Sequence, residues 1–296
     1  MSKAEGWNVQ ILDILDQDEL RTRARGMASI APGGVDRIEP VDFVGSACDI
    51  AELVPSEMHG SLDYILSSHN FEHLPDPLKF LDGAARLLKP GGLLVMAIPD
   101  ARGCFDFFRP VTTLGDWIEA RFEGRRHPRP RQVFDCKSRL ASPPSEDGRK
   151  SSGFTQPGSV QEVAIYGGLQ EIFDGWPKDG ESRAYIDTHC TVVTPAAFEL
   201  LILEARALGL IDLDLVAVVP TKGTEFFVRL RRSTGADTID AQTLQARRNA
   251  LARRALVERI TPGDVGFGTI AKARLRKLAS PIRTWNRKRR AKRRSR

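Results

Sequence analysis

Residues 63–100 read DYILSSHNFEHLPDPLKFLDGAARLLKPGGLLVMAIPD, and this stretch indicates the fold. Residues 61–68 form a short run suited to a β-strand. Residues 77–89 place leucines and alanines at helical spacing, with a proline near the start. Pro90-Gly91-Gly92 predicts a turn, and the apolar run LLVMAIP after it predicts a buried strand. A strand, a helix and a second strand in this order are typical of a mainly parallel sheet.

The pattern continues on both sides of this stretch. Residues 8–13 and 41–47 are short apolar runs that predict two earlier strands. Downstream, residues 195–208 predict a helix with Thr194 as its N-cap and Gly209 just after its end. Two further apolar runs, IDLDLVAVV and EFFVRL, are separated by five residues that include a glycine, which predicts an antiparallel hairpin. We therefore expect an α/β fold with a doubly wound, mostly parallel sheet and a C-terminal hairpin.

The composition divides the chain into a folded body and a tail. Residues 1–234 are expected to form one domain, with an irregular, proline-rich and arginine-rich insertion over 101–185. Residues 235–296 are predicted to be a helical or disordered tail. The 26 residues from position 271 contain thirteen lysines and arginines and no acidic residue, although the whole chain has a net charge of only +6. The excess of positive charge therefore belongs to the tail.

Several classes of protein are disfavoured by the sequence. It has no stretch of roughly 18 uninterrupted apolar residues and no N-terminal apolar run of signal-peptide type. Its four cysteines are scattered, which favours a reducing compartment. We expect a cytoplasmic protein without a transmembrane segment. Residues 271–296 are expected either to be a solvated extension or to bind a polyanion, namely nucleic acid or an anionic membrane surface, in which case the protein is peripheral to the membrane.

The order of the motifs resembles a known family. Asp13 ends the first apolar run, Asp49 follows the second, and then come DYILSSHNFEHLPDP and LLKPGGLLVMAIPD. This series is similar to class I, type 11-like S-adenosylmethionine-dependent methyltransferases, in which a strand ending near H-x-x-E-H-L-x-D-P precedes a helix, L-x-P-G-G and another strand. The resemblance extends over most of residues 8–231, and residues 63–100 are its specific part.

The resemblance implies S-adenosylmethionine as cofactor and assigns residues to it. Asp13 would accept the ribose hydroxyls, Asp49 would accept the adenine amino group, and Ile50 would lie beside the adenine ring. Ser67 and Ser68 would end a strand under the methionine portion. Ligands of open parallel sheets bind beyond the carboxyl ends of the strands, which is where these residues are predicted to lie. The alternative for both aspartates is a solvated strand end or a helix cap.

One part of the family pattern has no match. The family begins with a strand and a glycine-rich turn that holds the cofactor, whereas this chain begins at what resembles the second strand. We therefore expect the first strand and the glycine loop to be missing, through a misplaced start or a truncated gene. Two internal strand edges would then need another cover.

Three histidines attract attention. His69, Glu72 and His73 satisfy H-x-x-E-H, a zinc-peptidase pattern that needs a sustained helix. Because Pro75 and Pro77 end any helix at once, we predict no metal site. His69 is instead a candidate catalytic residue near the transferred methyl group, as a base for an acceptor hydroxyl. His189, after the insertion, is the second candidate, facing the acceptor; the alternative for each is a structural histidine.

The predicted function is methyl transfer from S-adenosylmethionine to a small-molecule or glycan-type acceptor. Two alternatives stay open: a catalytically inactive scaffold that has kept the fold, and a nucleic-acid methyltransferase directed to its substrate by the basic tail. Arg109 is a candidate for binding an acidic acceptor, or for an ion pair with Asp106 or Asp116.

Overall fold

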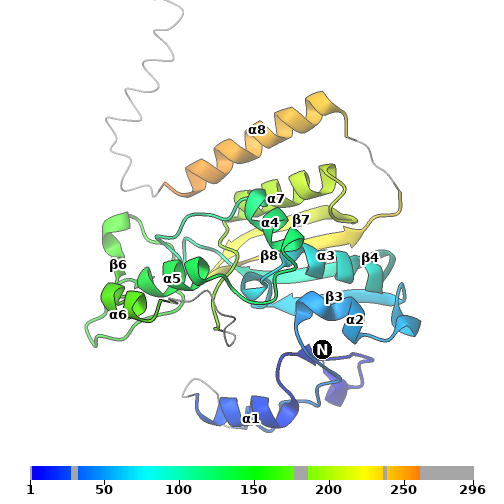
Figure 1. Cartoon of the computed structure of the whole chain (residues 1–296), viewed down its shortest axis with the longest axis horizontal. Coiled ribbons are helices and arrows are strands. Elements are labelled where there is room, and N and C mark those ends of the chain that lie inside the picture. Colours follow the sequence, from blue (N-terminus) through cyan, green and yellow to red (C-terminus); the bar gives the residue numbers. More distant parts are fainter. Residues whose placement is uncertain (1, 28–32, 177–185, 236–238, 261–296) are drawn as a thin grey trace, which may run out of the picture.

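The computed structural model describes residues 2–27, 33–176, 186–235 and 239–260 (Figure 1). The strands are β1 (Leu12–Asp13), β2 (Phe43–Val44), β3 (Leu62–Ser68), β4 (Leu88–Pro99), β5 (Ala141–Ser142), β6 (Ala164–Ile165), β7 (Leu213–Lys222) and β8 (Glu225–Arg232). The α-helices are α1 (Gln17–Arg25), α2 (Ile50–Leu53), α3 (Pro77–Leu87), α4 (Leu114–Phe122), α5 (Pro130–Ser138), α6 (Leu169–Asp174), α7 (Pro195–Ala207) and α8 (Ala241–Glu258).

The main sheet has four strands in the order β3-β4-β8-β7. β3 and β4 are parallel and are joined by α3, as the alternation of residues 63–100 predicts. β8 pairs antiparallel with β4 and with β7, which confirms the C-terminal hairpin. β1 and β2 form a separate, parallel two-stranded sheet. The predicted α/β class is confirmed, but the described main sheet is mixed and not mostly parallel, because the β7–β8 hairpin adds antiparallel strands directly beside β4.

The glycine pair after α3 behaves differently from the prediction. Instead of forming a turn before the strand, Pro90-Gly91-Gly92 lies inside β4, where the pairing with β3 shifts register between Leu62 and Tyr64. Gly91 has φ +78°, and a Cβ on Gly92 would lie 2.9 Å from the Leu62 carbonyl oxygen. The bulge therefore needs both glycines, because a side chain would be strained at the first and blocked at the second.

The hairpin is also tighter than predicted. The predicted connection had five residues, but Pro220, Thr221 and Lys222 continue β7, and only Gly223 and Thr224 separate the strands. Gly223 has φ +72°, which two-residue hairpin turns require and which glycine adopts without strain. The turn is thus set by Gly223.

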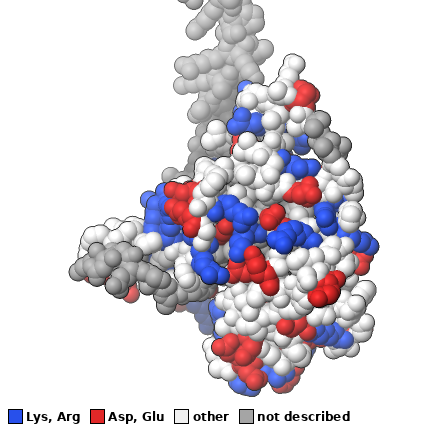
Figure 2. Space-filling model, turned by 45° about the vertical axis from the view of Figure 1, so that its right-hand side comes forward, with Lys and Arg blue, Asp and Glu red and all other residues white. Residues whose placement is uncertain are grey.

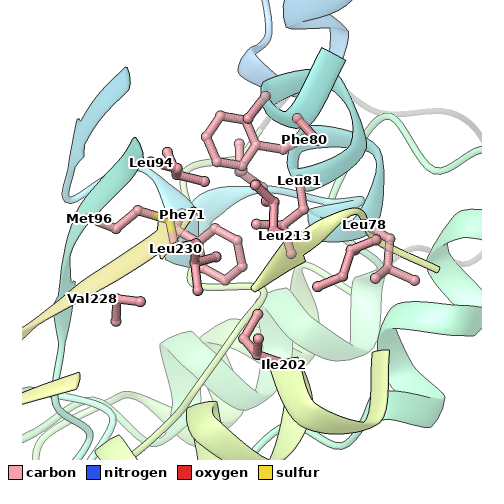
Figure 3. Close-up of a cluster of buried hydrophobic side chains, with 14 of the residues drawn as sticks. Phe71, Leu78, Phe80, Leu81, Leu94, Met96, Ile202, Leu213, Val228 and Leu230 are labelled. Carbon is pink, nitrogen blue, oxygen red and sulfur yellow. The ribbon is translucent and has the colours of Figure 1, made fainter. Parts of the chain in front are cut away.

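One face of the four-stranded sheet forms the core (Figure 3). Leu94 and Met96 of β4 and Val228 and Leu230 of β8 are fully buried against α3, α4 and α7. Phe71 lies at the centre of an aromatic cluster. Its ring makes edge-to-face contacts at centroid distances of 5.6–6.1 Å with three others, namely Phe80, Trp117 and Phe198. Such contacts fix the segment between β3 and α3 to the core.

The opposite face of this sheet and its β3 edge are more open. Leu66 of β3 is 58% exposed and Val216 of β7 is 46% exposed. Within the described ranges no strand pairs with the free edge of β3, and none joins it to β1. This open edge does not decide whether the first strand of the family pattern is missing, so that absence stays a prediction.

The insertion and the tail are described in part. Within the insertion α4, α5 and α6 are short helices, and β5 and β6 pair as a two-residue ladder. α8 begins with Asp240 as its N-cap and packs on α7. The polyanion-binding residues predicted at 271–296 lie outside the described residues, and the domain boundary at 234 stays a prediction. Figure 2 shows positive and negative side chains interspersed over one face of the body.

None of the helices within the described ranges is both long and apolar enough to cross a membrane.

Candidate functional site

The segment that follows β3 is held in an unusual backbone conformation. His69 has φ +47°, and it is the only described residue other than glycine with a positive φ. Its N–H donates to the Ala97 carbonyl of β4 at 3.1 Å. Residues Phe71–His73 then form a single 3-10 turn, and Leu74 ends it. The sustained helix that a zinc peptidase needs is therefore not formed, and His69 diverges from His73.

His69 lies between two carboxylates. Its Nε2 is 2.5 Å from Glu225 Oε2 on β8, and its Nδ1 is 3.5 Å from Glu72 Oε1. The nearby Glu72 carboxylate raises the pKa of His69 to about 9, against the opposing effect of partial burial, and Glu225 adds to the rise. At neutral pH the ring is mainly protonated. This state suits a hydrogen-bond donor better than the predicted base.

His189 belongs to a buried charge network at the two ends of the insertion. Its Nδ1 lies 2.5 Å from Asp106 Oδ2, and Arg109 Nη1 lies 2.5 Å from Asp106 Oδ1. Arg109 also donates to the His189 carbonyl at 2.9 Å. Burial raises the pKa of Asp106, but the hydrogen bond and charge of His189, together with Arg109, outweigh it and lower the pKa. Of the two predicted roles for Arg109, the ion pair with Asp106 is confirmed.

The structure brings His69, His73 and His189 together around Glu72. The backbone N–H groups of Cys190 and Thr191 donate to the Glu72 carbonyl at 2.6 and 3.0 Å. The rings of His73 and His189 meet edge to face with centroids 4.7 Å apart. Burial lowers the pKa of His73, and the charge of His189 lowers it further, so His73 is neutral at neutral pH.

Sequence reasoning did not select Glu72 or Asp106 as site residues. Glu72 is the acid of the H-x-x-E-H pattern. Because this pattern predicts a metal site only when it lies on a helix, it did not identify Glu72 here. The only sequence pattern around Asp106 is its spacing of three residues from Arg109. This spacing indicates a local ion pair and does not indicate a functional site. Neither pattern includes His189, which lies more than 80 positions further along the chain than both acids.

The predicted cofactor residues lie at the ends of β1, β2 and β3. Asp13 is the last residue of β1 and accepts the Leu15 N–H on Oδ1 at 3.0 Å; its Oδ2 has no partner in the part of the chain that is described. Asp49 lies just after β2 and forms ion pairs with Lys79 of α3 and, at 3.4 Å, with Arg126. Both aspartates thus follow strands of the same parallel pair.

The remaining predicted cofactor residues, Ile50 and the two serines at the end of β3, differ in exposure. Ile50 is 8% exposed, with its Cγ2 directed at Gly83 of α3. An adenine ring beside it would therefore touch only the small exposed part of the side chain. Ser67 Oγ accepts a hydrogen bond from Asn70 at 3.3 Å, and Ser68 is exposed at the end of β3. The binding roles of all five residues stay predictions.

A comparison with known families decides the type of domain. Residues 3–140 match the family described as a methyltransferase domain. This match covers a little under half of the chain and supports a class I, S-adenosylmethionine-dependent methyltransferase domain. The match includes β1 to β4, the two candidate aspartates and the H-x-x-E-H segment.

Solved structures resemble the methyltransferase domain and its surroundings only distantly. A protein from Pyrococcus horikoshii is 15% identical, with 78% of this chain and 76% of that chain covered and a TM-score of 0.34. A putative zinc-dependent alcohol dehydrogenase from Rhodobacter sphaeroides is 13% identical, with 78% of each chain covered and a TM-score of 0.41. A putative S-adenosylmethionine-dependent methyltransferase from Listeria monocytogenes is 10% identical, with 76% and 91% covered and a TM-score of 0.32. No curated protein matches the chain significantly in sequence.

S-adenosylmethionine is the cofactor that the sequence resemblance implies for this domain. The residues at the strand ends fit it. Asp13 has a free carboxylate oxygen for a ribose hydroxyl. Among the described residues, Oδ2 of Asp49 is held only by Arg126, whose side chain is 76% exposed, so an adenine amino group can replace this contact at small cost.

Proposed function

We propose that the domain transfers a methyl group from S-adenosylmethionine to a small-molecule or glycan-type acceptor. The match of residues 3–140 to the methyltransferase family carries this proposal. When bound, the cofactor supplies a methyl group already activated on a sulfonium. The acceptor therefore has to provide only a nucleophilic atom, which loses its proton as the new bond forms. The protein has to align the two molecules and exclude water.

The chain's own residues divide into two groups in this proposal. Asp13 and Asp49 bind the adenosine portion, and Ser67 and Ser68 lie under the methionine portion. His69 and His189 are on the acceptor side, beyond the ends of β3 and β4 and next to the insertion. Since His69 holds a proton at neutral pH and its Nε2 is hydrogen-bonded to Glu225, we assign it to shaping the acceptor side and not to proton abstraction. Its opening toward solvent, with 49% of the side chain exposed, supports this assignment.

Cofactor binding by the full chain is the first test of this proposal. Calorimetry with S-adenosylmethionine should show saturable binding at one site. Asp13→Asn keeps the shape of the side chain but removes the charge, so its affinity should fall about tenfold or more. Asp18→Asn, an exposed change of the same kind on α1, should leave the affinity unchanged. Absence of binding by the unaltered chain would favour the inactive scaffold instead.

The class of acceptor that is methylated provides a second test of this proposal. Transfer of a labelled methyl group should be tested on hydroxylated small molecules, on oligosaccharides and on RNA. Incorporation into either of the first two supports the proposal, whereas incorporation into RNA alone contradicts it.

A further inference from the structure

Glu72 is a buried carboxylate without a hydrogen-bond donor. It is 1% exposed, and in the described part of the chain neither of its side-chain oxygens has a hydrogen-bond partner. The nearest ring nitrogens, His69 Nδ1 and His73 Nε2, are 3.5 and 3.6 Å from Oε1, which is longer than a normal hydrogen bond. A carboxylate in this state is strongly destabilised relative to water. The protonated His69 ring compensates this charge only in part, because its Nδ1 lies 3.5 Å from Oε1 and forms no hydrogen bond with it.

Two histidines beside Glu72 each have a carboxylate at Nδ1. His189 Nδ1 is hydrogen-bonded to Asp106, and His73 Nδ1 lies 2.8 Å from Asp187 Oδ1, although the geometry of this second contact is not that of a hydrogen bond. The hydrogen bond leaves Nε2 of the neutral His189 ring with a lone pair to share, and Nε2 of His73 is the ring atom that approaches Glu72. A carboxylate at one ring nitrogen is the usual support of a histidine whose other nitrogen binds a metal ion.

We propose that Glu72, His73 and His189 bind a divalent transition-metal ion. Their three ligand atoms lie within 4.8 Å of one another. Two imidazoles and one carboxylate are a donor set that zinc accepts in tetrahedral sites with one position left open. Ligand atoms around zinc are about 3–4 Å apart. The three side chains therefore close on an ion with small rotations.

The backbone around these side chains is already in place. The N–H groups of Cys190 and Thr191 donate to the Glu72 carbonyl, so the segment that carries His189 is tied to the turn that carries Glu72 and His73. Phe71, next to Glu72, is fully buried in the aromatic cluster. An ion in this position neutralises the Glu72 carboxylate and replaces its absent hydrogen-bond donors.

This site differs from the zinc-peptidase pattern in the same segment. That pattern would use His69 and His73 as ligands and Glu72 as a base. Here Nε2 of His69 is directed to Glu225, while His189, from the far side of the insertion, completes the set. We predicted no metal site because this segment does not form a sustained helix. The site proposed here does not require such a helix.

Zinc titration of the chelator-treated full chain tests the proposal directly. Calorimetry with zinc chloride, checked by elemental analysis after gel filtration, should give one zinc per chain. Zinc should also raise the midpoint of thermal unfolding. Magnesium chloride should give no such binding, because magnesium prefers oxygen ligands. Less than stoichiometric zinc in the unaltered chain overturns the proposal.

Matched variants identify the ligands. Glu72→Gln keeps the size of the side chain and removes a buried charge, so it should fold; its zinc affinity should fall at least about 100-fold. His189→Gln should lose affinity similarly. His59→Gln, at a histidine outside this cluster whose Nε2 bonds the Val54 carbonyl, should change affinity by less than about threefold. Loss of binding in His69→Gln together with retention in His189→Gln would support the peptidase pattern and exclude the proposed set.

Discussion

His189 Nδ1 donates to Asp106 Oδ2 at 2.5 Å, across 83 positions of sequence. The two residues stand near the two ends of the insertion, so their pairing closes this long segment at its base. Arg109 binds the second oxygen of Asp106, and all three side chains are buried. The same contact that holds the insertion therefore also orients the imidazole of His189 toward Glu72.

Removing the charge of Asp106 should destabilise the fold. In Asp106→Asn the buried guanidinium of Arg109 loses its counter-charge, and we expect the free energy of unfolding to fall by about 3–5 kcal/mol. Urea unfolding followed by circular dichroism measures this change. Asp63→Asn removes an exposed ion pair with Lys89 and should cost no more than about 1 kcal/mol. Equal losses in the two variants would contradict the burial argument.

The aromatic cluster should contribute more stability than any exposed aromatic residue. Phe71→Ala removes a fully buried ring that contacts three others, and we expect a loss of about 3–5 kcal/mol. Phe122→Ala, at a position 84% exposed, should change stability by less than about 0.5 kcal/mol. Thermal and urea unfolding of both variants provide the comparison, and a small effect of Phe71→Ala would show that the cluster can repack.

Two helical glycines should respond in opposite directions to the same substitution. A Cβ on Gly83 of α3 would lie 2.7 Å from Ile50 Cγ2, so Gly83→Ala should cost about 1–3 kcal/mol despite the better helix propensity of alanine. Gly115 of α4 offers ordinary contact distances only, and Gly115→Ala should be neutral or stabilise by up to about 1 kcal/mol. Unfolding free energies decide this, and stabilisation by Gly83→Ala would mean that Ile50 can move aside.

Asp49 should make stability depend on pH in the acid range. Burial raises its pKa, but the hydrogen bond and charge of Lys79, assisted by Arg126, outweigh burial and lower it. A lowered pKa in the folded state gives stability above the unfolded value of about 4, and this stability is lost as pH falls through the folded value. Relative to Asp49→Asn, the natural chain should therefore be more stable by about 1 kcal/mol at pH 5–7.

The same comparison at lower pH completes the test of Asp49. The difference in unfolding free energy between the two proteins should shrink toward zero as pH falls below the unfolded value of about 4 and through the lower pKa of the folded state. Urea unfolding at a series of pH values measures it. A difference that stays constant through the acid range would mean that the variant acts through packing and not through the ion pairs.

Local pattern was sufficient for much of the fold. The spacing of apolar residues in 63–100 predicted β3, α3 and β4, because helices and strands bury side chains with different periods. Thr194 was predicted as the N-cap of α7 and is found there, since a cap depends on neighbours three residues away. The bulge at Gly92 and the short turn at Gly223 were missed, because both depend on where the partner strand lies.

The sequence by itself determined the order of strands and helices outside the insertion, the resemblance to methyltransferases, and the strand ends at which Asp13, Asp49 and Ser67 lie. Each of these depends on residues close together in the chain. Only the tertiary structure decided that Glu72 is buried without a donor, that His189 lies beside it, and that His189 pairs with Asp106. These relations join residues 80 or more positions apart. They are created when the sheet and the insertion pack together, and no local pattern of residues encodes them.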